Sequence, residues 1–518
     1  MDTSSLLLLL LACPLCACLI IACLPKSLSQ SLSAGVHLAS LAGSLGLCCY
    51  LLLEFYKSSQ SIFALDSWLM LDSLSAIFVA LVCLISAITG IVSLPYLKHE
   101  YGEGKIEQGQ IKQYYSFFQL FVFTMLLACL SNNIIMMWVA VEATTLGTVF
   151  LVGLYKKGAS LEAAWKYIII CTCGLAFGLY GTVLLYADGV SVLSNTHQAA
   201  FWTSLLPQAA AFDPILIQIA FVFIAIGFGT KAGLFPMHTW LPDAHAEAPS
   251  PISALLSAVL LKCAFLVIMR FYILANACLG ASFPCLVMMI LGALSVIIAA
   301  YFFFAQKDLK RKLAYSSTEN VGLIALCLGF GGPIGIFAAL FHCVAHALTK
   351  ALMFCLSGNI LMKYQTRDLT KISGFLQLAP LSATLCMFGF LALAGFPPFA
   401  LFWSELAMFV AGAQGSLIVL VIIVALALSI VLAAIAMTIN SVLFKKAPDH
   451  LKKKELPALM LVPELILLIL IVYLGVMQPK PVISALEEGA SIFGIEQSQF
   501  PEVSHGIRLE LKSKLPVQ

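Results

Sequence analysis

KAGLFPMHTWLPDAHAEAPSP, residues 231–251, is the stretch that decides the fold. It separates two apolar runs, residues 214–229 before it and a run that begins near Ile252 after it. Proline removes a backbone donor and clashes with the preceding turn, so the prolines of this stretch must break or distort a helix. Lys231 stands at the start of the stretch, and Lys262 lies in the second apolar run. A lysine beside a broken helix in an apolar setting is costly, which indicates a functional role.

Part of this stretch occurs again in the second half of the chain. Residues 232–236 (AGLFP) correspond to residues 394–398 (AGFPP), and an acidic residue, Glu405, follows the second copy. Two hydrophobic segments interrupted by Gly and Pro at corresponding places are typical of transporters built from internal repeats. Short strings of this kind also recur by chance in apolar sequence, and it is the flanking ionisable residues that favour a repeat here.

The composition indicates a polytopic membrane protein. Of the 518 residues, 61% are hydrophobic and 10% are charged, whereas a soluble domain carries about 25% charged residues. Basic and aromatic residues do not cluster together, so we expect no nucleic-acid partner. The seventeen cysteines lie in apolar runs, where a thiol behaves as a small hydrophobic group. We therefore expect no metal site, no disulfides and no cofactor held by this chain.

The apolar runs predict an all-α protein. A membrane-spanning helix needs about 20 apolar residues, and on this criterion the sequence predicts about fourteen transmembrane helices. They cover residues 5–24, 34–53, 72–94, 115–131, 133–154, 164–187, 214–231, 251–275, 281–304, 313–330, 333–361, 379–411, 417–444 and 457–477.

Basic residues gather in alternate loops of this arrangement. The loops at 98–112, 307–312 and 445–454 lie on one predicted side, whereas the other side holds Lys57 and, at the edge of a predicted helix, Arg270. Because cytoplasmic loops carry an excess of Lys and Arg, this pattern predicts cytoplasmic basic loops and periplasmic termini. The same loops either anchor a cytoplasmic partner or only set the topology.

Several ionisable side chains fall inside the predicted helices. They are Glu142, Lys231, Lys262, His342, His346, Lys350 and Glu405. His342, His346 and Lys350 are four residues apart, so they share one helix face. All of these groups exchange protons, and ionisable residues inside a membrane mark ion paths and proton relays.

Other interpretations of these residues stay open. A membrane lysine also reaches the interface with its flexible stem, and a buried histidine also serves helix packing. Lys231 could also contact carbonyls freed by the break. His238, Asp243 and His245 resemble metal ligands, but their spacing fits no standard site. We interpret these three residues as a proton entry or as caps of helix ends.

Three motifs carry a resemblance to a known family. They are KAGLFPMHTWLPDAHAEAPSPISALLSAVLLK (231–262), DLKRKLAYSSTENVG (308–322) and HCVAHALTKALMFCLSGNI (342–360). Together they resemble the antiporter-like proton-translocating subunits of complex I, group 4 hydrogenases, formate hydrogenlyase and Mrp cation/proton antiporters. WVAVEATTL around Glu142 and EAAWKY around Lys166 resemble the F-type members of hydrogenase-4 in particular.

The resemblance implies a fold of two inverted five-helix repeats that contain broken helices. On this basis we predict three N-terminal helices over 1–114, a first repeat over 115–275 and a second, inverted repeat over 276–445. A last helix and a C-terminal tail are predicted over 446–518. The longest family members add a C-terminal lateral helix, and we expect none here.

The resemblance also implies a role for each ionisable residue. Glu142 and Lys231 match a pair that acts as a charge switch, and Lys262 matches a connecting lysine. His342, His346 and Lys350 match a relay on one helix. Glu405 matches the terminal residue of the path.

The function implied is that of a proton-translocating membrane subunit of a multisubunit redox complex in the bacterial inner membrane. Its expected partners are the lipid bilayer, other membrane subunits, and iron–sulfur, nickel–iron or other soluble cytoplasmic subunits. The chain would be part of an oxidoreductase complex without a catalytic centre of its own. One alternative is an Mrp-type cation/proton antiporter subunit. Another is a proton-coupled membrane partner of a non-redox cytoplasmic enzyme.

Overall fold

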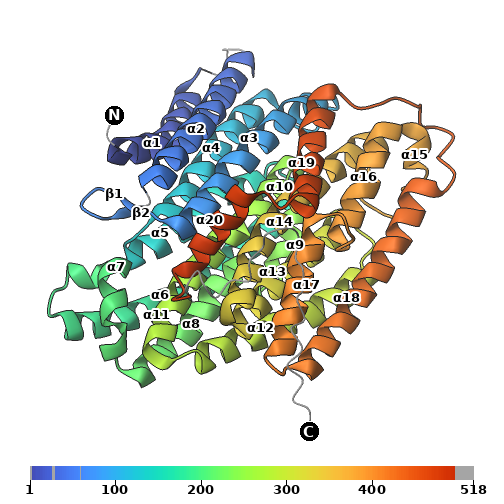
Figure 1. Ribbon diagram of the computed structural model, residues 1–518. Helices are drawn as coiled ribbons and strands as arrows, with labels where there is room; N and C mark the ends of the chain where they lie inside the picture. Colours follow the sequence, from blue (N-terminus) through green and yellow to red (C-terminus); the bar gives the residue numbers. More distant parts are fainter. Residues whose placement is uncertain (1–2, 26–29, 59, 496–518) are drawn as a thin grey trace, which may run out of the picture.

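A computed structural model describes residues 3–25, 30–58 and 60–495 of the chain (Figure 1). Twelve helices of this part are long and apolar enough to cross a membrane, which confirms an all-α polytopic membrane protein. They are α1 (Thr3–Cys23), α2 (Gln30–Ser58), α3 (Ser73–Gly102), α4 (Gln108–Leu130), α5 (Ile134–Val152), α6 (Gly158–Leu193), α8 (Pro214–Ala232), the continuous helix of α10 (Ser250–Leu255), η3 (Leu256–Leu260) and α11 (Leu261–Leu279), α12 (Ser282–Ala305), α14 (Gly332–Tyr364), α18 (Ile418–Ile439) with η4 (Asn440–Phe444), and α19 (Ala458–Val476).

The number of fourteen transmembrane helices stays a prediction. The predicted helix 313–330 is α13 (Leu309–Phe330), in which charged and polar residues lower the hydropathy. The predicted helix 379–411 is in fact two shorter helices, α16 (Pro380–Leu393) and α17 (Ala400–Gln414). The two helices are separated by AGFPP, the Gly/Pro interruption noted in the sequence.

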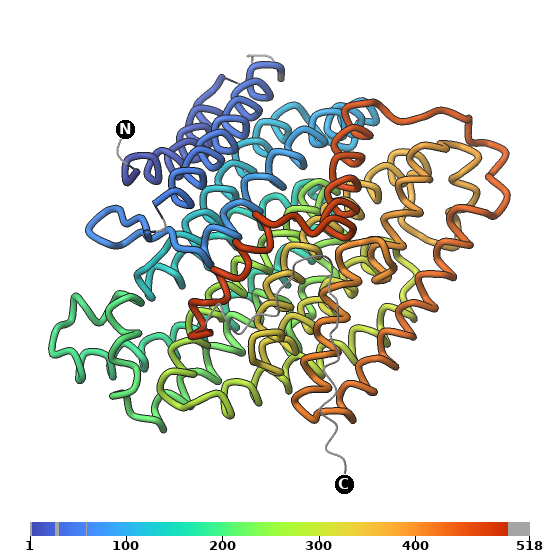
Figure 2. The backbone as a smooth tube through the Cα atoms, in the orientation of Figure 1, coloured from blue at the N-terminus to red at the C-terminus, as the bar shows by residue number. Residues whose placement is uncertain are grey.

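Shorter elements connect the long helices. They are the antiparallel strands β1 (Ile62–Ala64) and β2 (Leu69–Leu71), η1 (Gln198–Ala200), α7 (Trp202–Leu205), η2 (Leu206–Ala211), α9 (Trp240–Glu247), α15 (Phe375–Leu378) and α20 (Lys480–Ser491). Figure 2 follows the chain from the blue N-terminal helices at one edge of the bundle to the orange helices α16–α18 at the other edge. The helix α10–α11 and helix α14 form the core, and both are almost entirely buried.

Both Gly/Pro stretches break a helix, as predicted. Helix α8 ends at Ala232, Gly233 takes a φ of 84°, and α9 starts at Trp240. In the second stretch Gly395 takes a φ of 65° between α16 and α17. A left-handed backbone is favourable for glycine because it has no Cβ, and it ends a helix by turning the chain away.

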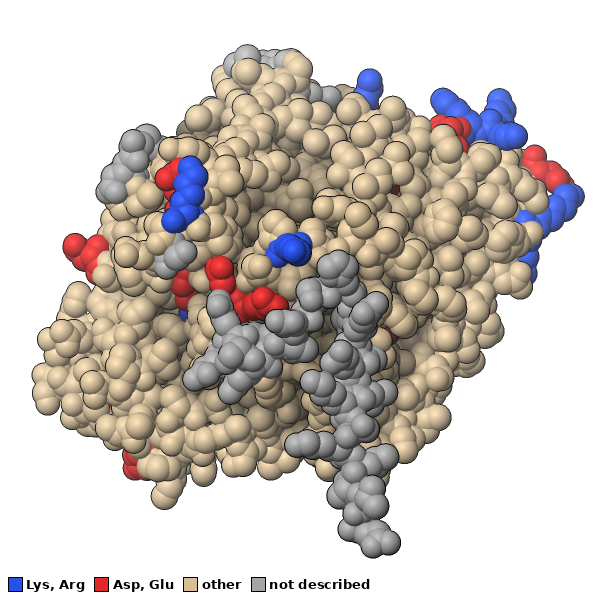
Figure 3. All heavy atoms as spheres, in the orientation of Figure 1, with Lys and Arg blue, Asp and Glu red and all other residues tan. Residues whose placement is uncertain are grey.

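The basic loops lie together at one end of the bundle, which we call the basic-loop face. Lys105 after α3 donates to the Gln365 side chain after α14 at 2.6 Å, and Lys363 donates to the carbonyl of Lys452 before α19 at 2.8 Å. Figure 3 shows basic groups gathered at this end, at the upper right, whereas most of the visible surface carries neither charge. The alternation predicted for these loops therefore agrees with the fold.

Arg270 does not belong to a loop, so its assignment to a loop was wrong. It lies within α11 with 2% of its surface exposed, and its guanidinium donates two hydrogen bonds of 2.6 Å to the Asp72 carboxylate. Asp72 also caps α3 by accepting from the backbone N–H of Ser75. This buried ion pair fixes the first turn of α3 against α11.

The chain continues past α19 into another helix. After Met477 and Gln478, α20 packs against α3 and α14, with Gly489 beside Ile77 and Leu340 (Figure 1). The C-terminal tail predicted from the sequence contains this short amphipathic helix at residues 480–491. The last part of the predicted tail, 496–518, lies outside the described residues.

Glycines allow α6 and α8 to approach closely. A Cβ at Gly227 on α8 would collide with the backbone of Gly178 on α6. We expect Gly227→Ala to lower the free energy of unfolding by about 1–3 kcal/mol, because backbone atoms cannot give way as a side chain can. Gly46→Ala on α2 is the matched control, since its Cβ would meet no atom within 4 Å. Thermal unfolding in detergent measures both, and equal melting temperatures would contradict this packing.

Candidate functional site

Lys231 is fully buried at the end of α8, where the helix breaks. Its ammonium group donates hydrogen bonds of 2.7 Å to Thr145 on α5 and 2.7 Å to the phenol of Tyr167 on α6. The Tyr167 ring also lies 4.6 Å below the ammonium nitrogen. Trp240, the first residue of α9, donates at 2.8 Å to the Thr230 carbonyl in the last turn of α8. Two hydroxyls and an aromatic ring thus hold a charge that the bilayer core would exclude.

Glu142 is half-buried on α5, one turn from Thr145. One carboxylate oxygen accepts a hydrogen bond of 2.8 Å from Thr172 on α6, and the other has no hydrogen-bond partner in the described part of the chain. Glu142 and Lys231 do not form an ion pair among the described residues, although both contact the α5–α6 pair. The structure therefore brings the two groups of the predicted charge switch to one helix pair without closing an ion pair between them.

Lys262 lies just after a single π turn, η3, in the buried helix α10–α11. Its ammonium group donates to the Ser257 carbonyl at 2.7 Å. A π turn widens the helix, interrupts the regular hydrogen bonding and is frequent at functional sites. The hydroxyl of Ser257 in turn contacts the hydroxyl of Ser317 on α13 at 2.7 Å.

Helix α13 connects Lys262 to Lys350. Ser317 donates to the Leu313 carbonyl at 3.1 Å, and Lys350 donates to the same carbonyl at 2.8 Å and to the Ser316 hydroxyl. A row of hydrogen-bonding groups therefore runs from α11 and η3 through α13 to α14, and every member is buried.

His342 extends this row toward the second broken helix. One ring nitrogen lies 2.9 Å from the Ser404 hydroxyl on α17, and the other lies 3.1 Å from the Asn320 side-chain oxygen on α13. Asn320 donates to the Glu319 carboxylate at 2.8 Å. The His346 ring stacks at 6.1 Å from His342, and neither of its nitrogens has a hydrogen-bond partner among the described residues.

Glu405 follows Ser404 on α17, and its carboxylate packs against Gly395 in the second helix break. A Cβ at Gly395 would collide with that carboxylate. Glycine is favoured there by its positive φ, and any side chain at this position would displace the Glu405 carboxylate. The break itself forms one wall of the Glu405 site.

His238, Asp243 and His245 occupy different surroundings and do not converge. Asp243 forms ion pairs with Arg311 and, at 3.2 Å, with Lys166. His245 is fully buried, and its ring stacks on Phe354 at 4.9 Å. Both His245 nitrogens and one of His238 have no hydrogen-bond partner in the described part of the structure. Asp243 therefore lies beside exposed basic side chains, whereas His245 is buried in the interior.

A family model described as "NADH:quinone oxidoreductase/Mrp antiporter, TM" matches residues 131–431, which hold every residue of this row. The chain belongs to this antiporter family. It is 41% identical over 356 residues to the hydrogenase-4 component F homolog of Methylacidiphilum infernorum (isolate V4), a match that covers 68% of this chain and 75% of that protein.

Solved structures share the fold of this antiporter family member. A chain of the membrane-bound sulfane sulfur reductase (MBS), an archaeal respiratory membrane complex, superposes with a TM-score of 0.84 at 24% identity, over 95% of this chain and 98% of that chain. A chain of the Mrp complex from Dietzia sp. DQ12-45-1b gives a TM-score of 0.82 at 19% identity, over 95% and 97% of the two chains.

Several buried polar residues of this antiporter chain were missed in the sequence-based predictions. Glu319 and Asn320 belong to the polar run 315–320 within a predicted helix, a run that was used only as a motif. Its residues are nearly all buried, so a polar run inside an apolar helix was the available signal. Glu464 on α19 is also fully buried and accepts from Asn359 on α14 at 2.8 Å.

Lys310 was counted among the loop residues but is 1% exposed. It lies in the first turn of α13 and donates to the Ala248 carbonyl, at the end of α9. This contact ties the basic-loop end of α13 to the segment that follows the first break.

Proposed function

We propose that this chain translocates protons as a membrane subunit of a multisubunit redox complex of the hydrogenase-4, formate hydrogenlyase or complex I type. The observation that carries the proposal is the buried row of groups from Lys262 through Ser257, Ser317 and Leu313 to Lys350. Amines and hydroxyls can exchange protons, whereas the backbone carbonyls of Ser257 and Leu313 only accept hydrogen bonds and hold the ammonium groups of Lys262 and Lys350 next to the serine hydroxyls. The relatives named above support membrane subunits as partners.

Each predicted residue takes a place along this row. Lys231 and Glu142 share the α5–α6 pair at one end, where a change of the local field would alter the charge on Lys231. The altered charge on Lys231 would change the proton affinity of Lys262, and a proton would then move from Lys262 through the α13 hydroxyls to Lys350. His342, which contacts Ser404, and the neighbouring His346 would then carry the proton from Lys350 toward Glu405 at the second break.

His238, Asp243 and His245 form the proton entry from the basic-loop face in this proposal. Asp243 lies under two basic side chains, Lys166 and Arg311, and the buried imidazole of His245 follows it along α9. The excess of Lys and Arg on this face supports a cytoplasmic orientation in a bacterial inner membrane, with both termini periplasmic. The two broken helices, one in each of the segments 115–275 and 276–445, support the division into two repeats.

Purification of the tagged complex in a mild detergent tests this function. Identification of the co-purifying subunits is the first readout, and proton flux driven by the electron donor in reconstituted vesicles is the second. Iron–sulfur or nickel–iron subunits together with donor-driven flux would support a redox pump. Co-purification of small membrane subunits alone, together with sodium-dependent proton flux, would instead indicate an Mrp-type exchanger. A single soluble protein without redox centres would instead indicate a proton-coupled partner of another enzyme.

The connection that α13 makes between Lys262 and Lys350 can be tested by removing one hydroxyl group. We expect Ser317→Ala to lower proton flux by about tenfold, because it removes the contact with Ser257 and separates Lys262 from Lys350. Ser86→Ala on α3 is the matched control, since this serine is equally buried and lies outside the row. Flux is measured per assembled complex in reconstituted vesicles. Equal flux in the two variants would remove Ser317 from the path.

A further inference from the structure

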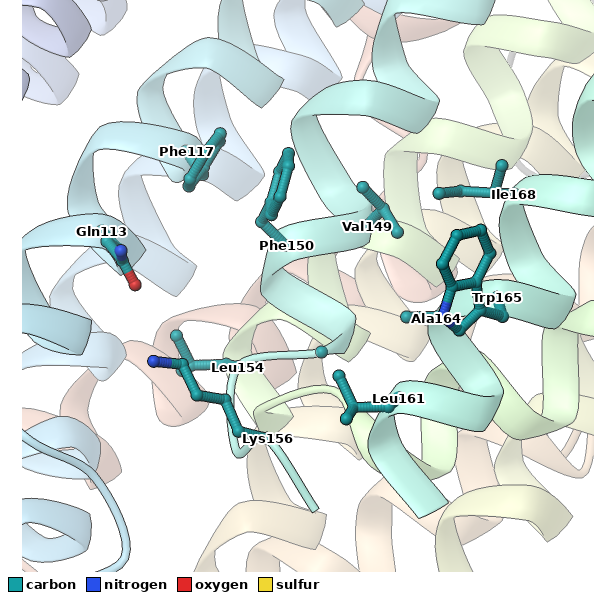
Figure 4. Close-up of a pocket in the computed structure, with 11 residues that line it drawn as sticks. Gln113, Phe117, Val149, Phe150, Leu154, Lys156, Leu161, Ala164, Trp165 and Ile168 are labelled. Atoms are coloured by element: carbon teal, nitrogen blue, oxygen red, sulfur yellow. The ribbon is translucent and has the colours of Figure 1, made fainter. Parts of the chain in front are cut away.

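An open groove of about 520 Å³ lies between α4, α5 and α6 next to the loop after α5 (Figure 4). Its walls include Phe117 from α4, Phe150 from α5, and Leu161 and Trp165 from α6. None of the residues proposed for the proton path lines it. The groove opens on the outer side of the bundle, where the Phe150 and Trp165 side chains are 57% and 65% exposed.

The groove is polar at one end and apolar along the rest. Gln113 and Lys156 direct their side chains toward the same space at the end near the loop (Figure 4). One turn further into α4, the ring of Phe117 stacks on that of Phe150 at 4.7 Å. Trp165 stands in the second turn of α6, where a membrane–water interface favours tryptophan. The polar end and the apolar remainder of the groove therefore match the two parts of a membrane lipid, whose headgroup lies at the surface and whose acyl chains lie deeper.

The polar end carries free positive charge. Lys156 and Lys157 are both exposed, and neither takes part in an ion pair among the described residues. Basic residues close to a membrane surface attract anionic headgroups. We propose that this groove binds one anionic phospholipid, with its phosphate at Lys156 and Gln113 and its acyl chains against Phe117, Phe150 and Trp165.

A lipid fits these features better than a transmembrane helix of a partner. A packed helix would fill the apolar walls but would give no role to unpaired lysines gathered at one end. A bound lipid also supports the spacing of α5 and α6, the two helices that the Glu142–Thr172 hydrogen bond joins. The proposal does not depend on proton translocation and can fail independently of it.

Native mass spectrometry of the purified full chain tests the site. The delipidated protein is incubated with phosphatidylglycerol or with phosphatidylcholine. We expect one phosphatidylglycerol to remain bound at a concentration that leaves phosphatidylcholine unbound. Lys156→Gln should weaken this binding by about fivefold, as expected for the loss of one basic contact near an anionic surface. Leu161→Trp, which fills the groove, should abolish it.

Lys445→Gln is the matched control, because Lys445 is an exposed lysine on the same face far from the groove. It should retain phosphatidylglycerol as the unaltered chain does. Equal retention of both lipids, or unchanged retention after Lys156→Gln, would overturn the proposal. A cross-link from Leu161→Cys to another membrane subunit in intact membranes would also overturn it, because a partner helix would then occupy the groove.

Discussion

Replacing Lys231 with methionine is expected to reduce proton translocation by about a hundredfold or more. Removal of a positioned proton-transfer group typically lowers a rate by about a hundredfold or more. Among the described residues, no other cation donates to Thr145 or Tyr167. Methionine has a similar length and packs well in an apolar interior, so the helix break should remain. Proton flux of the reconstituted complex is the measurement, with the amount of assembled complex as the reference.

The hydroxyl partners of Lys231 make this test specific. Thr145→Val removes one acceptor but leaves the ammonium group and its contact with Tyr167, so a partial loss of flux is expected. Lys445→Met is the control for the loss of one lysine from the chain, and it should pump normally because Lys445 is exposed on the basic-loop face. Normal pumping by Lys231→Met in an assembled complex would refute the proposed path at its first member.

Replacing Arg270 with methionine should cause the largest loss of stability. The change leaves the Asp72 carboxylate buried without its two hydrogen bonds from the guanidinium. Breaking a buried ion pair on one side costs about 3–5 kcal/mol. The Trp202 ring, which lies 4.6 Å from the guanidinium carbon, also loses its contact. Thermal unfolding in detergent should show a melting temperature well below that of the unaltered chain.

A second substitution separates the ion pair from general packing. The double variant Arg270→Met and Asp72→Asn removes both charges, keeps a side-chain oxygen to cap α3, and should regain part of the stability. Arg311→Met is the matched control, since Arg311 pairs with Asp243 at a site where its side chain is 43% exposed. Exposed pairs contribute at most about 1 kcal/mol. If Arg270→Met and Arg311→Met destabilised the chain equally, burial of the first pair would not matter.

The helix breaks could be predicted because their cause is local. Gly233 and Gly395 take positive φ values, and prolines follow each of them within a few residues. The backbone preferences of glycine and proline depend only on neighbouring residues in the sequence. The same holds for the face shared by His342, His346 and Lys350, since the spacing of residues on one helix fixes it.

The connections between helices could not be predicted in this way. The partner of Arg270 is 198 residues away in sequence, so the arginine looked like part of a loop at a helix edge. The π turn that places the Ser257 carbonyl beside Lys262 depends on packing in the core and has no residue signature. The polar run 315–320 was visible, but its position between Lys262 and Lys350 follows only from how α13 packs against η3 and α14.

The contact between the hydroxyls of Ser257 and Ser317 has a consequence for direction. A hydroxyl can donate or accept, and either oxygen can be the donor in this contact. While Ser317 donates to the Leu313 carbonyl, Ser257 is the donor in this contact. Rotation of the Ser317 O–H away from that carbonyl reverses the contact without moving a helix. In the proposed path this rotation would let the centre of the molecule pass a proton either way, so the groups at its two ends would have to set the direction of transport.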